Sequence, residues 1–171
     1  MKKILLALTG LLCFVSVYSQ TGKHVFSLGK QDFLLDGKPF QIISGEMHPA
    51  RIPREYWRHR IQMAKAMGCN TIAAYFMWNY HETAPGIFDF KTGNKDVAAF
   101  IRTCQEEGMW VLFRPGPYVC AEWDFGGLPT RLLKVPDIKI RCRDPRYMKA
   151  VAEYVKAISA QVKNLQCNNG G

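Results

Sequence analysis

Two junctions of the same kind constrain the fold of this chain more than any other feature. Gly68 and Gly108 lie 40 residues apart, and each ends a stretch with helical apolar spacing and is followed directly by an apolar run. Glycine commonly ends helices because it adopts positive φ without a steric cost. Repeated helix–glycine–strand units with continuously apolar strands are typical of a parallel sheet covered by helices.

The spacing of apolar residues predicts three helices and the strands between them. Helices are predicted over 53–68, 96–108 and 144–165, with Asp144 as the cap of the last one. Strands are predicted over 69–78 and 109–113, and an earlier apolar run ends in "SGEMH" at 44–48. Asp36-Gly37 lies between two apolar runs and predicts a two-residue hairpin turn.

Long polar loops follow the predicted strands, and short turns precede them. This asymmetry favours an α/β fold of the (β/α)8 TIM-barrel type, whose sites lie at the carboxyl ends of the strands. Such a barrel needs about 250 residues, so we expect about three βα units, the N-terminal portion of a barrel that is incomplete as given. A doubly wound open sheet is the alternative, but "SGEMHPARIP" after the first strand is not a glycine-rich phosphate loop.

The first residues have the pattern of a secretory signal peptide. Lys2 and Lys3 precede an apolar run from Ile4 to about Val17, and small residues near Ser19 suit cleavage. We therefore expect residues 1–19 to be a signal peptide, residues 20–171 to form part of one catalytic domain, and the protein to be secreted or periplasmic. A buried N-terminal helix or a membrane anchor is the alternative. After cleavage we expect no membrane association.

The charge does not indicate a nucleic-acid partner. The chain has a formal net charge of +9. Its one basic cluster is interpreted as a solvated helix face, because no groove-reading motif accompanies it. The cluster consists of Arg51, Arg54, Arg58, Arg60 and Lys65.

The cysteines specify no disulfide. Five remain after cleavage, and no Cys-x-x-Cys occurs among them: Cys69, Cys104, Cys120, Cys142 and Cys167. Cys69 and Cys104 lie in apolar runs and are predicted to be packing residues.

Polar and aromatic residues collect at three predicted strand ends, which would be neighbours in a barrel. They suit a sugar, because rings pack on its C–H face and carboxylates accept hydrogen bonds from its hydroxyls. The candidates are Glu46, His48, Tyr75, Trp78, Asn79, His81, Glu82, Tyr118, Glu122, Trp123 and Asp124.

Several candidates have a purely structural alternative. Trp78 and Trp123 could be core residues, and Glu46 or Glu82 could hold an arginine such as Arg114. His81-Glu82 begins like a zinc helix motif, but Pro85 stands where the second histidine should be, so no metal is expected. Cys120 lacks a Cys-His signature and is interpreted as part of the site wall rather than as a nucleophile.

Several stretches together resemble the N-terminal part of glycoside hydrolase family 35 β-galactosidases. The most specific is "RPGPYVCAEWDFGGLP" at 114–129; others are "FLLDGKPFQIISGEMH", "RIPREYWRHRIQMAKAMGCNT", "YFMWNYHE" and "DPRYMKAV". The resemblance implies a catalytic (β/α)8 barrel with accessory β domains. It also implies that terminal β-linked galactose is removed by a retaining mechanism without a cofactor. The expected partners are a β-galactoside and the rest of the catalytic domain.

The resemblance also implies site residues. Tyr75 and the wall formed by Val119, Cys120, Ala121 and Glu122 would contact the sugar, with the Glu122 carboxylate gripping its hydroxyls. The family's acid/base and nucleophile are both expected beyond Gly171, so the chain as given is expected to be inactive and poorly stable.

Three departures from the family pattern concern the rim of the pocket and leave the identity of the preferred sugar undetermined. They are Pro49 after the histidine, Ala74 before Tyr75, and Arg131 in "GGLPTRLL". The alternatives are a non-catalytic galactose-binding product of a truncated gene and a related exo-glycosidase that prefers another sugar, such as a glucosaminide.

Overall fold

The computed structural model describes residues 22–171, so the predicted signal peptide lies outside the described residues. The strands are β1 (Phe26–Leu28), β2 (Phe33–Leu35), β3 (Lys38–Pro39), β4 (Ser44–Met47), β5 (Thr71–Tyr75), β6 (Glu82–Ala84), β7 (Ile87–Phe88) and β8 (Trp110–Arg114). The α-helices are α1 (Trp57–Ala66), α2 (Trp78–His81), α3 (Val97–Glu106) and α4 (Pro145–Val162).

Short 3-10 helices occupy several connections. They are η1 (Pro49–Arg51), η2 (Arg54–Tyr56), η3 (Gly93–Lys95), η4 (Asp124–Gly127), η5 (Thr130–Lys134), η6 (Lys163–Leu165) and η7 (Cys167–Asn169). No helix within residues 22–171 is long and apolar enough to cross a membrane.

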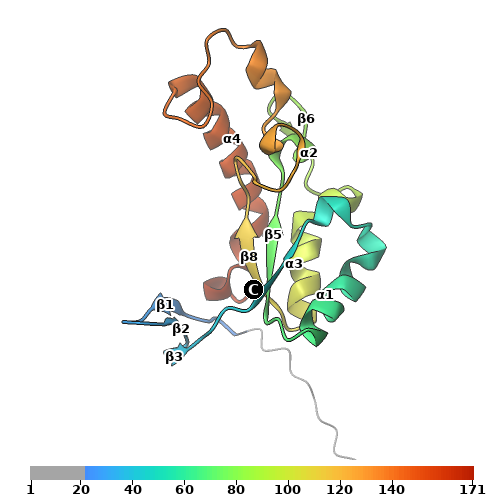
Figure 1. Cartoon of the computed structure of the whole chain (residues 1–171), viewed down its shortest axis with the longest axis vertical. Coiled ribbons are helices and arrows are strands. Elements are labelled where there is room, and N and C mark those ends of the chain that lie inside the picture. The colour runs from blue at the N-terminus through green and yellow to red at the C-terminus, as the bar shows by residue number, and fades with distance from the viewer. Residues whose placement is uncertain (1–21) are drawn as a thin grey trace, which may run out of the picture.

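A parallel sheet in the order β4-β5-β8 forms the centre of the molecule (Figure 1). The strands are adjacent in chain order, and β5 lies in the middle with every residue buried. The carboxyl ends of β5 and β8 point toward α2, β6 and the long loop after β8 (Figure 1). The segments that follow these strands therefore start from one edge of the sheet.

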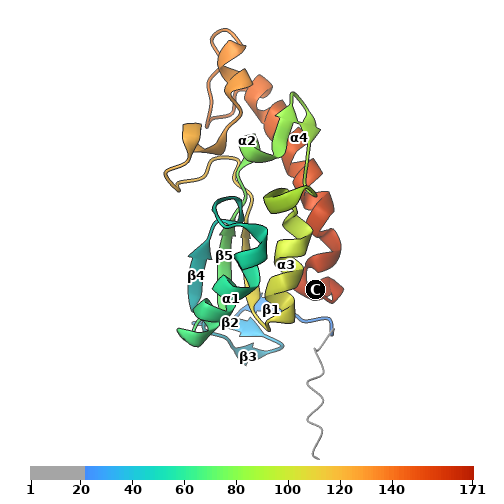
Figure 2. The ribbon, with the colours of Figure 1, turned by 90° about the vertical axis from the view of Figure 1, so that its right-hand side faces the viewer.

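One face of this sheet is covered by helices. Alternate residues of β5, Ile72 and Ala74, belong with Phe76 just after the strand to one apolar cluster. The cluster also contains residues from α1, α3 and α4, including Trp57, Phe100 and Ile158. The helices lie on the same side of β4 and β5 (Figure 2). In the described residues the strands and helices alternate in the predicted βα order, with α1, α3 and α4 packed in one apolar cluster against the sheet.

Tyr154 of α4 ties this helix to the ends of two strands. Its buried hydroxyl donates to the carbonyl oxygens of Pro115 and Phe76, at 2.8 and 3.1 Å. Burial raises the pKa of Tyr154 well above its usual range. The loop after β8 therefore starts from a fixed point.

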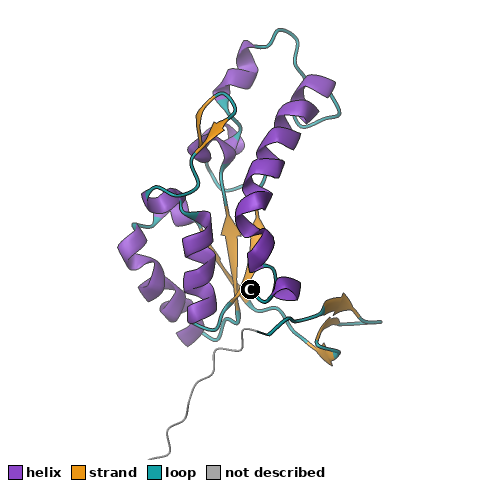
Figure 3. Cartoon of the chain, turned by 180° about the vertical axis from the view of Figure 1, so that it is seen from behind, coloured by secondary structure: helices purple, strands orange, loops and turns teal. Residues whose placement is uncertain are grey.

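The predicted turn and the predicted Asp144 cap are present. Asp36 and Gly37 have φ values of 52° and 75° and connect β2 to β3. The resulting small antiparallel sheet, β1-β2-β3, lies at the end of the molecule opposite α2 and β6 (Figure 3). Asp96 and Asp144 cap α3 and α4 by accepting from the backbone N–H groups of Ala99 and Arg146.

Element boundaries differ from the predictions at two places. The first helix begins at Trp57 rather than at Pro53, because residues 54–56 form a 3-10 turn before it. The second strand ends at Tyr75 rather than at Trp78, because Trp78 starts the short helix α2.

Candidate functional site

The site lies at the carboxyl ends of the three parallel strands. Tyr75 pairs in register with Arg114, and Glu46 pairs with Ala73 two residues before Tyr75. Because alternate residues of a strand point to the same face, Glu46, Tyr75 and Arg114 lie together on the face away from the helices. Sheet geometry alone therefore gathers three polar side chains at one edge.

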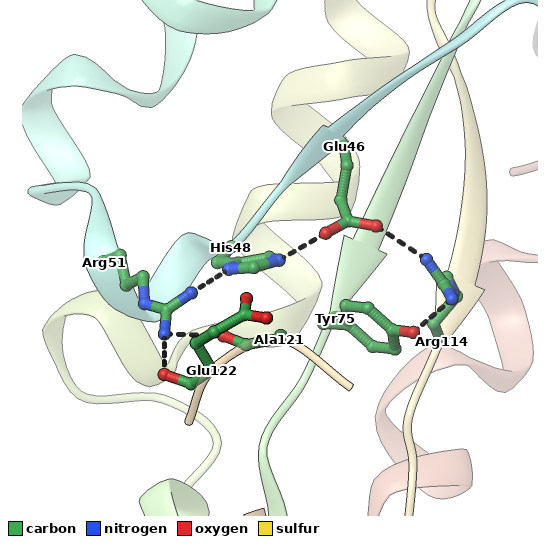
Figure 4. A network of polar contacts seen from close by, with 7 residues as sticks. All are labelled: Glu46, His48, Arg51, Tyr75, Arg114, Ala121 and Glu122. Atoms are coloured by element: carbon green, nitrogen blue, oxygen red, sulfur yellow. Dashed lines mark hydrogen bonds and ion pairs between the residues drawn. The ribbon is translucent and has the colours of Figure 1, made fainter. Parts of the chain in front are cut away.

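These side chains belong to a continuous polar network (Figure 4). The Arg114 guanidinium donates to Glu46 Oε2 at 2.8 Å and also to the Tyr75 hydroxyl, above whose ring it lies at 3.7 Å. Glu46 Oε1 lies 2.8 Å from His48 Nε2. The prediction that Glu46 could hold Arg114 is confirmed.

The same network reaches the loop after β8 through Arg51. One Arg51 nitrogen lies 2.6 Å from His48 Nδ1, and the other donates to the carbonyl oxygens of Ala121 and Glu122, each at 2.7 Å (Figure 4). Arg51 is exposed, as expected of the basic cluster, but its guanidinium also binds this loop, which was not predicted. It lies in η1, and its role depends on two backbone carbonyls that no sequence pattern reveals.

The wall predicted from "VCAE" alternates between buried and exposed residues. Val119 and Ala121 are buried and pack in one cluster with Tyr75 and Met77. Cys120 and Glu122 are exposed. The structure thus brings together all five residues of the predicted sugar site, two as support and two as exposed groups beside Tyr75. Whether they bind a sugar stays a prediction.

Backbone turns hold the wall in place. Val119 N–H donates to the Gly126 carbonyl at 2.8 Å, and Gly126 N–H donates to the Trp123 carbonyl at 2.9 Å. A side chain at Gly126 would collide with the ring of Tyr118, and its φ of 61° also favours glycine. The Arg141 guanidinium lies over the Tyr118 ring, at 3.9 Å from its centroid.

Glu122 is presented in an unusual way. Its φ of 44° is uncommon for a residue with a side chain, and within residues 22–171 its carboxylate takes part in no hydrogen bond or ion pair. The next residue, Trp123, is half-buried and donates from Nε1 to Asn79 Oδ1 at 2.8 Å. A free carboxylate beside a fixed indole ring is an arrangement that can accept hydrogen bonds from a polyhydroxylated ligand.

Three of the sequence candidates lie outside this site. Trp78 is fully buried and stacks on Tyr154 at 5.0 Å, which confirms the core alternative. His81 is buried, and this burial lowers its pKa to about 4. Its Nδ1 lies 3.0 Å from the Asp89 carbonyl. The prediction that Trp78 and His81 belong to the site is therefore wrong.

Glu82 also has a structural role. Its buried carboxylate forms an ion pair with Arg131 at 2.8 Å rather than with Arg114. The arginine that departs from the family pattern therefore neutralises a buried acid. Within residues 22–171, no cluster of three or more His, Cys, Asp or Glu side chains could hold a metal ion.

The cysteines of the described part are all free thiols. Cys104 is buried in the core as predicted, and this burial raises its pKa to about 12. Cys69 is half-buried and packs on the same core, also as predicted.

Comparisons with known proteins agree on one family. The family model described as glycosyl hydrolases family 35 matches residues 32–171. A β-galactosidase from Xanthomonas manihotis is 48% identical over 139 residues, which cover 81% of this chain and 23% of that protein. A β-galactosidase from Mus musculus is 43% identical over 169 residues, covering 98% of this chain and 26% of that protein.

A solved structure shares the fold at low sequence identity. The exo-β-1,4-mannosidase Op5Man5 from Opitutaceae bacterium strain TAV5 superposes with a TM-score of 0.61 and 18% identity, over 77% of this chain and 24% of that one. The chain spans about a quarter of the length of the relatives it matches. Since the family model covers most of the sequence, the chain belongs to glycosyl hydrolase family 35.

Proposed function

We propose that this chain forms the galactose-contacting portion of a β-galactosidase. The observation that carries the proposal is the exposed Glu122 carboxylate, which no other described residue engages, on a loop clamped by Arg51 next to Tyr75. Carboxylates and amphipathic rings are the groups that bind sugar hydroxyls and C–H faces. The curated relatives named β-galactosidase support galactose as the sugar.

The chemistry proposed for the whole protein is a retaining hydrolysis. Such a reaction uses two carboxyl groups about 5–5.5 Å apart, one as acid/base and one as nucleophile. We expect both in the part of the protein that follows Gly171. In this assignment Glu122 is a binding residue that accepts hydrogen bonds from galactose hydroxyls, and Tyr75 contacts the sugar next to it.

For the whole domain we propose a closed (β/α)8 barrel, to which the described residues contribute about three βα units. Two features support this. The face of the sheet away from the helices carries a half-exposed leucine, Leu112, between Trp110 and Arg114. Beside β8 there is also a largely apolar hollow of about 1030 Å³, lined in part by Phe26, Leu112 and Leu165. A further parallel strand placed there would cover both.

The proposed role of Glu122 is tested by Glu122→Gln in the whole protein. We expect kcat/KM for an aryl β-galactoside to fall about 10- to 100-fold, since hydrogen bonds to a charged group are worth about 1.5–3 kcal/mol. Glu153→Gln on the exposed side of α4 is the matched control and should leave kcat/KM unchanged. Equal activity of both variants would contradict the assignment.

A second test needs no turnover. Cys120 lies in the proposed wall and Cys142 lies outside it, and both are exposed. We expect iodoacetamide to label both, and saturating galactose to slow labelling of Cys120 at least about threefold while leaving Cys142 unchanged, because a bound sugar excludes the reagent. Peptide mass spectrometry measures each site, and unchanged labelling of Cys120 would argue against sugar contact there.

Assays on the whole protein also distinguish the two alternative functions. A panel of aryl glycosides identifies an exo-glycosidase that prefers another sugar. Saturable heat with galactose but no hydrolysis of any substrate in the panel identifies a non-catalytic binding protein. Export to the periplasm or the medium is a further proposal, and N-terminal sequencing of the mature protein tests it, with cleavage expected near Ser19.

A further inference from the structure

The proposed sugar-binding groups Tyr75 and Glu122 come from different elements, and one histidine lies between the arginines that hold them. Arg114 contacts Tyr75, and Arg51 holds the backbone of Glu122. His48 bridges the two halves, through Glu46 on one side and Arg51 on the other (Figure 4).

The hydrogen-bond partners of His48 determine which of its ring nitrogens carries the proton. A guanidinium group has only donors and stays charged in proteins. His48 Nδ1, 2.6 Å from the Arg51 nitrogen, must therefore accept a hydrogen bond. The proton of a neutral imidazole is then on Nε2, which donates to Glu46 Oε1 at 2.8 Å. In this network His48 is a neutral imidazole with one donor and one acceptor, both in use.

Arg51 is itself fixed before it reaches the loop. It ends the turn η1. Trp57 of α1 donates from Nε1 to the carbonyl oxygens of Pro49, the first residue of that turn, and of Ile52, which follows it, at 3.3 and 3.0 Å. The guanidinium is therefore anchored through its backbone by Trp57 and oriented through its side chain by His48.

The segment that Arg51 holds needs such support. Glu122 has a φ of 44°, and a residue with a side chain keeps that conformation only when its surroundings maintain it. Arg51 donates to the carbonyls of both Ala121 and Glu122, at 2.7 Å each. These two bonds fix the direction in which the Glu122 side chain leaves the backbone.

We propose that His48 is a positioning residue for sugar binding: by accepting from Arg51 and donating to Glu46, it sets the orientation of Glu122 relative to Tyr75. The proposal rests on the proposed function of Glu122. His48 need not touch the sugar, because its effect passes through Arg51 to the backbone of residues 121–122.

Two substitutions in the whole protein separate this role from a general effect on folding. In His48→Asn the side-chain oxygen occupies roughly the place of Nδ1 and can accept from Arg51. In His48→Leu the acceptor is lost at similar volume. We expect His48→Leu to weaken galactose inhibition about tenfold, and His48→Asn to restore it to within about threefold of wild type. Equal weakening in both variants would overturn the proposal.

A double-mutant cycle with Glu122→Gln provides the decisive readout. If His48 acts by orienting Glu122, His48→Leu should weaken galactose inhibition little further once Glu122 has been replaced. Additive losses would show that His48 acts elsewhere and would overturn the proposal. An unchanged inhibition constant in Glu122→Gln alone would instead contradict the proposed function, so the two failures are distinguishable. Thermal midpoints of all four proteins identify any variant that is merely unfolded.

Discussion

The two faces of the β4-β5-β8 sheet differ in what lies on them. On the covered face, Ile72 and Phe76 are fully packed against three helices. On the open face, Glu46 and Arg114 form an ion pair, and Leu112 remains 46% exposed. The apolar residues that pack against the helices and the polar residues of the site thus lie on opposite faces of one sheet, because alternate residues of each strand point to different faces.

A residue of the helical layer also holds the backbone from which the site loops begin. Tyr154 of α4 reaches through to the carbonyls of Phe76 and Pro115, where the strands end and the site loops begin. The polar network on the open face is therefore attached to a rigid support. Changes on the covered face should affect stability first, and changes on the open face should affect binding.

The largest effect on stability is expected from Phe76→Ala. Phe76 is 2% exposed and its ring lies 5.0 Å from that of Phe113. Its truncation leaves a cavity on the covered face and should lower the free energy of unfolding by about 3–5 kcal/mol. Met67→Ala, at an 81% exposed position after α1, is the control and should change it by less than about 0.5 kcal/mol. Urea denaturation measures both free energies. Similar losses in the two variants would contradict the conclusion that packing on the covered face stabilises the fold.

A buried histidine should make stability depend on pH. Burial holds the pKa of His81 at about 4, below its ordinary value of 6.5, so folding favours the neutral ring. This contribution is complete above pH 6.5 and is lost as the pH falls toward 4, up to about 3 kcal/mol. We expect the thermal midpoint to fall over this range in wild type.

His81→Asn supplies the matched control for that pH dependence. The asparagine amide can still donate to the Asp89 carbonyl, which lies 3.0 Å from Nδ1, but it does not titrate. Its thermal midpoint should change much less between pH 6.5 and 4. A slope equal to that of wild type would assign the acid sensitivity to other groups.

The smallest effect is expected at a helix terminus. Asp96 accepts from Ala99 N–H at 2.9 Å and pairs with Arg54 at 3.1 Å. Asp96→Ala should lower the free energy of unfolding by about 1 kcal/mol, because the first turn of α3 loses its cap. Asp96→Asn keeps a capping oxygen and should cost less. A loss in Asp96→Asn as large as in Asp96→Ala would locate the effect in the ion pair with Arg54.

Local chemistry made much of the fold predictable. The glycines at 68 and 108 follow the ends of α1 and α3 with φ of 92° and 70°, and Asp144 caps α4, as expected from the sequence. Boundaries were less predictable. Apolar continuity through Trp78 favoured a longer strand, but packing of Trp78 on Tyr154 placed it in a helix instead.

The site was predictable where neighbours in sequence stay neighbours in space. "VCAE" and Tyr75 come together because they follow adjacent parallel strands. His81 is buried rather than in the site, and Glu82 pairs with Arg131. Neither was predictable, because a residue's type does not reveal whether its side chain is buried in the fold. The contacts of Arg51 were not predictable because its partners, two carbonyls in residues 121–122, lie about 70 residues further along the chain.

The sequence by itself determined the order of the three long helices and the parallel strands, the Asp36-Gly37 turn and the family, because these depend on periodicity, caps, glycines and local motifs. Tertiary structure alone decided which polar residues serve the core and which face outward. Burial made His81 and Glu82 structural, whereas pairing in register and the reach of Arg51 joined Glu46, His48 and Arg114 into one network. The physical reason is that hydrogen bonds and desolvation depend on distances between side chains, which only the folded chain defines.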